Sequence, residues 1–427
     1  MIKKGFIVTI IFIISTFIQL ASQIIVTRLF GAHVELDIFL AAVAIPTVAV
    51  TIIYSTLNDV LLPFMGEIKI KQEADKESYY ISYTTTLTFV SFLIALVLTF
   101  FATPIAQFMY AGKGPEFIHQ TSLEMQYLFF GIPIAVLVSC LGSYYYLHKN
   151  FTRFPLAQLL GTVFNLILVV GLYPTFGIWA LIIAFVLNLV LQIPFVFPKE
   201  IFKGSFRWIN VLPFLLSWLP LMLGAFASRA DTLLIRTFAA YLPTGYFVYL
   251  NLISKIFSIA TSVMTIGIQV MLLPHLVEYI HTQKYDEAVQ SVNKAKILSI
   301  FISIAVTVTL ILFAPFAINL LFVGGKFTAK DAQITNSLLP LFILPAIGWG
   351  ISAVFFQPLL ALKKGVHVGI LNVVALVIAW LVATIVNRYA GALPAITTGL
   401  IVLLFIGISG SEILWQYYKK KLMSSVL

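Results

Sequence analysis

Charged residues are scarce in this sequence, and their scarcity excludes several classes of protein. Asp, Glu, Lys and Arg make up 10% of the 427 residues, against roughly 25% in an average soluble domain. Hydrophobic residues make up 61%, and the mean hydropathy is +1.04. This composition excludes a soluble globular domain and a disordered chain. Basic surfaces that bind nucleic acid need surrounding water, so the pI of 9.4 does not indicate a nucleic-acid partner.

Cysteine is almost absent, and histidine is not arranged for chemistry. The single cysteine, Cys140, lies in an apolar run, which excludes an internal disulfide framework and a cysteine metal cluster. The six histidines fall in predicted loops or at the ends of apolar runs, with no metal-ligand spacing and no nucleophile motif. The sequence therefore predicts no enzyme, no metal site and no cofactor.

What the sequence has in abundance is long apolar runs. A helix needs about 20 apolar residues to cross the hydrocarbon core of a bilayer. We therefore predict an all-α polytopic membrane protein with twelve transmembrane helices and no separate soluble domain. The predicted spans are 5–28, 38–65, 81–103, 121–147, 155–173, 177–198, 212–240, 245–275, 297–323, 336–361, 367–386 and 392–416. The longest predicted links lie near 66–80, 104–120 and 276–296.

The lysines and arginines of the links predict the orientation. If the N-terminus, with Lys3 and Lys4, is cytoplasmic, most cations of the links fall on the cytoplasmic side. The exceptions are Lys113, Lys326, Lys330 and Arg388. This bias holds along the whole chain and predicts that both termini are cytoplasmic. A cleaved signal peptide is disfavoured, because the first apolar run extends to about Val26, longer than a typical signal core.

Two parts of the chain resemble each other. The motif Arg28-Leu-Phe-Gly is echoed by Arg236-Thr-Phe-Ala, and the Leu-Leu-Pro motif of 61–63 recurs at 272–274. Six spans separate the copies, an even number, so both copies have the same orientation. We therefore predict two parallel-repeat six-helix bundles, residues 1–205 and 206–427. Repeats of this kind place the substrate site between the bundles, near the bilayer midplane.

Polar residues recur at helical spacing in the first, second, seventh and eighth spans. Polar side chains that face lipid are unfavourable, so these faces are expected to see water or protein. We predict a polar cavity that the four spans share. Its predicted lining residues are Gln19, Gln23, Thr51, Ser55, Asn58, Asn251 and Ser258. The alternative is that hydroxyl and amide groups join neighbouring helices by hydrogen bonds.

Ionisable residues within the spans or at their edges are the main candidates for function. A charge at the centre of a bilayer costs about 2.5–3.5 kcal/mol on insertion scales, so such residues face a cavity or a partner. The cations predicted to bind substrate are Arg28, Arg229, Arg236 and Lys255. Their excess favours an anionic substrate, and the planar fork of arginine suits phosphate.

The acids predicted to act in coupling or gating are Asp37, Asp59 and Asp231. Asp231 lies about 200° around a helix from Arg229, so it needs a partner on another helix. For Arg28 and Asp37 the alternative is snorkelling to the interface. For Asp59 the alternative is a solvated position at the cytoplasmic mouth.

Several motifs resemble a known family. The run Ile25-Val-Thr-Arg-Leu-Phe-Gly-Ala32, followed by Asp37-Ile-Phe39 and Ile45-Pro46, resembles the opening of the MurJ/MviN lipid II flippases of the MOP exporter superfamily. Further matching motifs are Asn150-Phe-Thr-Arg-Phe-Pro155 with Asn165, Leu272-Leu-Pro274, and Gly325-Lys-Phe-Thr328 followed by Asp331. The motifs occur in the family's order and cover nearly the whole chain.

The resemblance implies a V-shaped, MATE-like pair of bundles in the bacterial cytoplasmic membrane. Such a protein moves lipid II, the undecaprenyl-pyrophosphate-linked peptidoglycan precursor, to the outer leaflet by alternating access. Arg28 and Asp37 match the family's first-span motif, and Lys255 aligns with an arginine of its eighth span. Other family arginines fall at neutral positions here, near Thr16, Ser22 and Val50, whereas Arg229 and Arg236 add charge to the seventh span.

These departures leave alternatives open. The substrate could be another lipid-linked glycan, such as an exopolysaccharide or teichoic-acid precursor. A cation-coupled drug exporter needs an acid-dominated cavity, which the excess of cations disfavours. A non-transporting scaffold of an envelope-synthesis complex fits the missing arginines. The expected partners are a polyprenyl-pyrophosphate-linked glycan, membrane lipids and envelope-synthesis proteins; membrane potential, protons and sodium ions all remain open as the driving force.

Overall fold

The computed structural model describes residues 2–71, 76–199 and 204–424. Side chains are described within these ranges except at 2–6, 67–71, 76, 260–271, 274, 353 and 422–424. All regular elements in the described residues are helical, and one isolated bridge joins Gly324 to Phe327. The chain divides into two compact units, Met1–Phe226 and Ala227–Leu427, which are described separately below.

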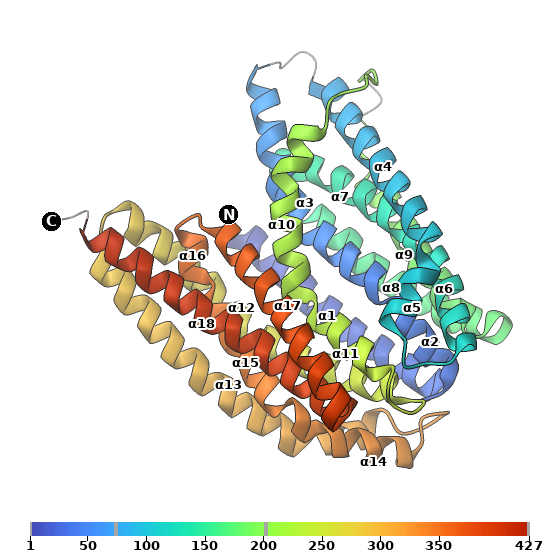
Figure 1. The fold of residues 1–427 in the computed structure, drawn as a ribbon. Coiled ribbons are helices and arrows are strands. Elements are labelled where there is room, and N and C mark those ends of the chain that lie inside the picture. The colour runs from blue at the N-terminus through green and yellow to red at the C-terminus, as the bar shows by residue number, and fades with distance from the viewer. Residues whose placement is uncertain (1, 72–75, 200–203, 425–427) are drawn as a thin grey trace. The chain divides into compact units, whose positions relative to one another are not determined.

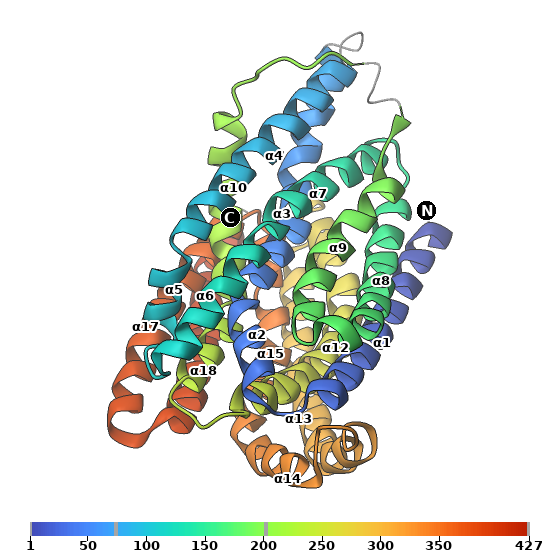
Figure 2. The ribbon, with the colours of Figure 1, turned by 90° about the vertical axis from the view of Figure 1, so that its right-hand side faces the viewer.

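The described residues of the first unit form the helices α1 to α10, the last of which crosses the boundary of the unit (Figures 1 and 2). They are α1 (Ile2–Phe30), α2 (Val34–Ala42), α3 (Ala44–Lys71), α4 (Lys76–Phe100), α5 (Ala102–Met109), α6 (Pro115–Phe129), α7 (Gly131–Leu147), α8 (Arg153–Phe176), α9 (Trp179–Val196) and α10 (Leu212–Arg229). The predicted division into bundles at 205/206 stays a prediction; in the structure, α10 packs within the first compact unit. The Trp218 indole N–H donates to Thr56 Oγ1 at 2.9 Å, and Phe214 packs against Phe64.

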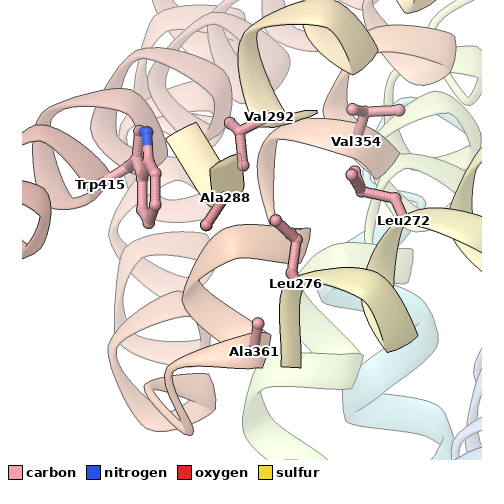
Figure 3. Packing of buried hydrophobic residues seen from close by; sticks show 7 residues of the cluster. All are labelled: Leu272, Leu276, Ala288, Val292, Val354, Ala361 and Trp415. Atoms are coloured by element: carbon pink, nitrogen blue, oxygen red, sulfur yellow. The ribbon is translucent and has the colours of Figure 1, made fainter. Parts of the chain in front are cut away.

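The second unit contains the remaining helices, with α17 and α18 side by side (Figure 1). They are α11 (Asp231–Ala239), α12 (Tyr246–His281), α13 (Tyr285–Leu321), α14 (Ala329–Leu338), the 3₁₀ helix η3 (Leu339–Phe342), α15 (Ile343–Phe355), α16 (Gln357–Ala361), α17 (Gly365–Ala390) and α18 (Ala392–Ser424). Apolar residues from five of these helices form one core (Figure 3). Its buried members are Leu272, Leu276, Ala288, Val292, Val354, Ala361 and Trp415.

The prediction of an all-α polytopic membrane protein is confirmed. Within the described residues, eleven helices are long and apolar enough to cross a membrane. The predicted span 245–275 lies in α12, whose described apolar part is Tyr246–Ile259. The predicted link 276–296 is largely helical, since α12 continues to His281 and α13 begins at Tyr285. Hydropathy detects only the apolar part of a helix and misses its charged ends.

Several predicted spans are broken helices, and proline causes three of the breaks. Proline has no N–H to donate to the carbonyl four residues earlier. The helices α2, α4 and α6 each end at that residue: at Ala42 before Pro46, at Phe100 before Pro104, and at Phe129 before Pro133. Proline alone does not decide the outcome, because helices continue through other prolines.

The break between α10 and α11 has no such proline. Ala230 donates its N–H to Ala227 O at 3.4 Å, which tightens the last turn of α10. Asp231 then begins α11, and its Oδ1 accepts the N–H of Thr232 at 2.7 Å. A short acidic side chain that bonds nearby backbone competes with a continuous helix, which accounts for this break.

Candidate functional site

Three predicted cations lie together in the second unit. Arg229 ends α10, Arg236 lies on α11, and Lys255 lies on α12. Both guanidinium charges act on the Lys255 ammonium. Arg229 and Lys255 are exposed, whereas Arg236 is buried. The structure therefore brings three of the four predicted cations into one electrostatic group, which we call the cationic trio.

Asn251 holds one member of this group in position. Arg236 Nη2 donates to Asn251 Oδ1 at 3.3 Å. Asn251 lies one turn before Lys255 on α12, so the two side chains share a helix face. A buried guanidinium needs acceptors for its donors, and the amide oxygen supplies one. The predicted lining residue Asn251 thus also orients a cation.

Asp231 is the acid beside the cationic trio. It is half-buried and interacts electrostatically with Arg229, and the indole of Trp349 on α15 hydrogen-bonds to it. The expected partner on another helix is therefore Trp349. Arg229, two residues earlier in the chain, acts on Asp231 through its charge. One acid beside three cations leaves an excess of positive charge, which suits an anionic ligand.

Arg28 and Asp37 lie in the first unit, in different environments. Arg28 is half-buried in the last turn of α1. This turn is fixed because the Tyr173 hydroxyl donates to Leu29 O at 3.0 Å. Gly31 follows with φ +67° and donates its N–H to Thr27 O at 2.8 Å. The glycine of the Arg-Leu-Phe-Gly motif is thus a helix cap in the left-handed region.

Asp37 on α2 is completely buried, unlike a residue that snorkels to the interface. Its charge acts on Lys113, which lies in the turn before α6. Burial lowers the pKa of the Lys113 ammonium below its usual value, and the Asp37 carboxylate opposes this shift. Asp37 is therefore part of a charged pair at this end of the first unit.

The other predicted residues of the first unit do not form one group. Gln19, Ser55 and Asp59 are exposed. The remaining polar contacts are local: Gln23 Nε2 donates to Thr27 Oγ1 at 3.3 Å, and Thr51 Oγ1 donates to Thr47 O at 2.8 Å.

Asn58 is buried and accepts a hydrogen bond from Ser143 of α7. This contact fits the alternative in which polar groups join helices. In the second unit, Ser258 is exposed on α12, one turn beyond Lys255 in the same direction along the helix. The polar cavity that the first, second, seventh and eighth spans are predicted to share stays a prediction.

Two buried ionisable residues, Lys296 and Glu124, and the half-buried Glu412 are not among the predicted site residues. Lys296 was assigned to a cytoplasmic link, but it lies inside α13, is buried, and pairs with Glu412 of α18. Its ammonium lies 4.9 Å from the centre of the Phe355 ring. Glu124 on α6 is buried as well. Both acids fall inside predicted spans, 121–147 and 392–416, and that position is the signal that could have found them.

The Gly-Lys-Phe-Thr motif caps a helix. Thr328 Oγ1 accepts the N–H of Asp331 at 3.2 Å, and Asp331 Oδ2 accepts the N–H of Thr328 at 2.7 Å, which makes a capping box at the start of α14. The other carboxylate oxygen, Oδ1, accepts the Tyr249 hydroxyl at 2.6 Å. The motif therefore ties α14 to α12, the helix that carries Lys255.

Comparison with known proteins gives a consistent result. Residues 26–423 match the model of the family described as lipid II flippase MurJ. A probable lipid II flippase MurJ of Borreliella burgdorferi is 25% identical over 372 residues, which cover 83% of this chain and 72% of that protein. The probable lipid II flippase MurJ of Buchnera aphidicola is 21% identical over 351 residues, which cover 78% of this chain and 68% of that protein.

Solved structures show the same fold. A lipid II flippase MurJ in an inward closed conformation matches with a TM-score of 0.81 at 18% identity, covering 97% of this chain and 87% of that one. An inward-facing MATE multidrug transporter of the MOP superfamily matches with a TM-score of 0.71 at 16% identity, covering 95% of this chain and 96% of that one. At these identities the likeness establishes the fold and leaves the substrate to be argued from residues.

Proposed function

The chain belongs to the MurJ family of lipid II flippases, and on this premise we propose that it moves lipid II from the cytoplasmic to the outer leaflet of a bacterial cytoplasmic membrane by alternating access. It acts as a transporter rather than an enzyme, with both termini in the cytoplasm, as the distribution of loop cations predicts. Its partners are the lipid-linked glycan, the surrounding lipids and proteins of envelope synthesis.

The cationic trio is the observation that supports this proposal. The exposed side chains of Arg229 and Lys255 are available to the two phosphates of the lipid II headgroup. Arg236 acts from its buried position as a fixed charge, since Asn251 holds it. Guanidinium groups bind phosphate through paired N–H donors, and charge-assisted bonds of this kind are the strong ones.

In this proposal, Asp231 is the counter-charge of the cationic trio in the substrate-free protein. Its interaction with Arg229 partly neutralises the trio when no substrate is present. A pyrophosphate competes with Asp231 for Arg229, so binding and release change the partner of a single arginine. Because a ligand shifts a conformational equilibrium only through its differential affinity, this exchange is a means to couple binding to rocking of the bundles.

Substitution of the exposed cations tests the proposal. We expect Lys255→Gln and Arg229→Gln each to weaken binding of undecaprenyl pyrophosphate by about ten- to a hundredfold, since one charge-assisted contact contributes about 1.5–3 kcal/mol. Both should also fail to rescue cells depleted of their own lipid II flippase. Lys330→Gln, an exposed lysine of α14 in the same unit, is the matched control. Rescue by both variants at normal membrane levels would contradict the proposed role of the trio.

A second lipid-linked glycan is the other candidate substrate. It is favoured by the neutral residues near Thr16, Ser22 and Val50, where the family has arginines. The two candidates differ in one outcome: a chain that binds undecaprenyl pyrophosphate but does not rescue the depleted cells carries a different glycan on the same lipid. The pyrophosphate is common to both, so the role of the trio is unchanged.

A further inference from the structure

A carboxyl group without a partner lies inside the first unit. Glu124 on α6 is 5% exposed, and its Oε2 has no hydrogen-bond partner among the described residues. Thr121, one turn earlier on the same face, is completely buried, and its Oγ1 also has no partner there. An ionised carboxylate in such a place is so unfavourable that the group neutralises instead.

The charge that acts on Glu124 has the same sign. Helix α2 packs against α6, and the Glu35 carboxylate of α2 repels a negative charge on Glu124. Asp37, also on α2, acts on Lys113. Repulsion by one carboxylate and the lack of a hydrogen-bond donor both favour the neutral form of Glu124.

The other elements around α6 supply no compensating cation. Helices α5, α7 and α9 contain no Asp, Glu, Lys, Arg or His. On α4, Lys76 and Glu77 lie in the first turn, whereas the far end of that helix contacts α6, where Thr99 Oγ1 donates to Gln126 O at 3.4 Å. On α3, the first charged residue is Asp59, which is exposed. On α6 itself, Glu116 and His119 are exposed.

A proton fits this place better than a metal ion. A metal needs several ligands, and the described residues contain no group of three or more His, Cys, Asp or Glu side chains that could hold one. A proton needs a single oxygen, which the Oε2 atom of Glu124 provides. Glu35 is exposed to solvent and its charge acts on Glu124, which makes it the titratable group of α2 through which a proton could pass.

We propose that Glu124 is a proton-binding site of the first unit, protonated at neutral pH and discharged through Glu35 during the transport cycle. In binding, the carboxylate takes a proton from water and becomes a neutral acid; in release, the proton returns to water through the Glu35 carboxylate. Only the link to transport rests on the proposed function, because the protonation itself does not depend on the substrate.

Infrared spectroscopy of the purified full-length protein tests protonation directly. A protonated carboxyl group has a C=O stretching band that a carboxylate lacks. We expect wild-type protein at neutral pH to show this band, Glu124→Gln to lose it, and Glu116→Gln, an exposed acid on the same helix, to keep it. A band unchanged in Glu124→Gln overturns the proposal. A band that appears in wild-type protein only when sodium is removed also overturns it, in favour of a sodium site.

Transport in proteoliposomes tests the coupling. We expect a proton gradient to change the flipping rate of wild-type protein several-fold and that of Glu124→Gln not at all, with Glu35→Gln slowing the response. An equal response in wild type and Glu124→Gln overturns the coupling. If Glu124→Gln does not fold, the C=O band is titrated against pH in wild-type protein and in Thr121→Val. Removal of the hydroxyl next to Glu124 should move the pH midpoint of the band, and an unmoved midpoint overturns the assignment of the band to Glu124. Absence of flipping with a normal band would refute the proposed function and leave the proton site intact.

Discussion

At the scale of single residues, the cationic trio combines fixed and accessible charges. Arg236 is buried and held by Asn251, while Lys255 is exposed one turn further along α12. A held guanidinium loses little conformational freedom when a ligand arrives, whereas an exposed lysine has to be ordered. The two residues therefore differ in how their substitution should act.

Removal of the Asn251 side chain should affect both stability and binding. Asn251→Ala deprives a buried guanidinium of an acceptor, so we expect a loss of about 1–3 kcal/mol in the free energy of unfolding. Binding of undecaprenyl pyrophosphate should weaken too, because Arg236 loses its orientation. Thermal unfolding and ligand titration measure the two effects. Asn251→Gln keeps the amide and should recover part of both; a wild-type affinity in Asn251→Ala would show that Arg236 needs no such support.

The residues also show what sequence can and cannot predict. Arg229, Arg236 and Lys255 were identifiable because a charge inside an apolar span is rare. Their mutual proximity was not, since it depends on how α10, α11 and α12 pack. The burial of Lys296 was not predicted, because its partner Glu412 lies on another helix. Glu124 lies inside an apolar run and carried the same signal as the three cations. Spacing locates a residue along a helix, whereas its partner belongs to another helix.

At the scale of elements, the buried pair Lys296–Glu412 joins α13 to α18. The Lys296 side chain is 9% exposed and that of Glu412 is 33% exposed. Gln416 also donates to Glu412, at 2.7 Å. If the lysine is removed, Glu412 keeps Gln416 as a partner and some contact with water. If the acid is removed, Lys296 loses its carboxylate partner and remains buried. The two ends of the pair are not equivalent.

The pair should therefore respond asymmetrically to substitution. We expect Glu412→Leu to lower the free energy of unfolding by about 2–4 kcal/mol, because a buried cation is left without its acid, and Lys296→Met to lower it by less. The double variant should be more stable than Glu412→Leu alone, since no charge is left behind. Denaturant unfolding in detergent measures all three. Equal losses from the two single changes would contradict the inferred difference in burial.

The cap of α14 permits a finer test. Thr328→Ala removes the hydroxyl that accepts the Asp331 N–H, and we expect a loss of about 1 kcal/mol. Thr328→Ser keeps the hydroxyl and should leave stability unchanged. Thermal unfolding of the two variants side by side gives the comparison. If alanine and serine behave alike, the capping box contributes nothing to the link between α14 and α12.

At the scale of the whole molecule, the fold was the most predictable property. The apolar runs predict an all-helical membrane protein, and the described residues of these runs form apolar helices in the structure. The breaks at Pro46, Pro104 and Pro133 were not predicted, because hydropathy does not register a missing backbone N–H.

Labelling of introduced cysteines tests the predicted orientation, because the sequence contains a single cysteine. Cys140 is completely buried, so the wild-type protein should not react with a membrane-impermeant thiol reagent. We expect Lys330→Cys to be labelled on intact cells and Lys284→Cys to be labelled only after permeabilisation. Both lysines are exposed. The opposite pattern would place both termini outside and invert the proposed direction of transport.

The break between α10 and α11 differs in kind from the others. A proline break is permanent, because the missing hydrogen cannot be restored by any rearrangement. Between Arg229 and Asp231 every residue keeps its backbone N–H, and no proline lies at the position that would forbid a straight helix. This joint is therefore reversible on covalent grounds. Hydrogen bonds and charge around one aspartate interrupt the helix here, so this position of the seventh span can respond to a change of charge on Asp231, whereas the breaks set by proline cannot.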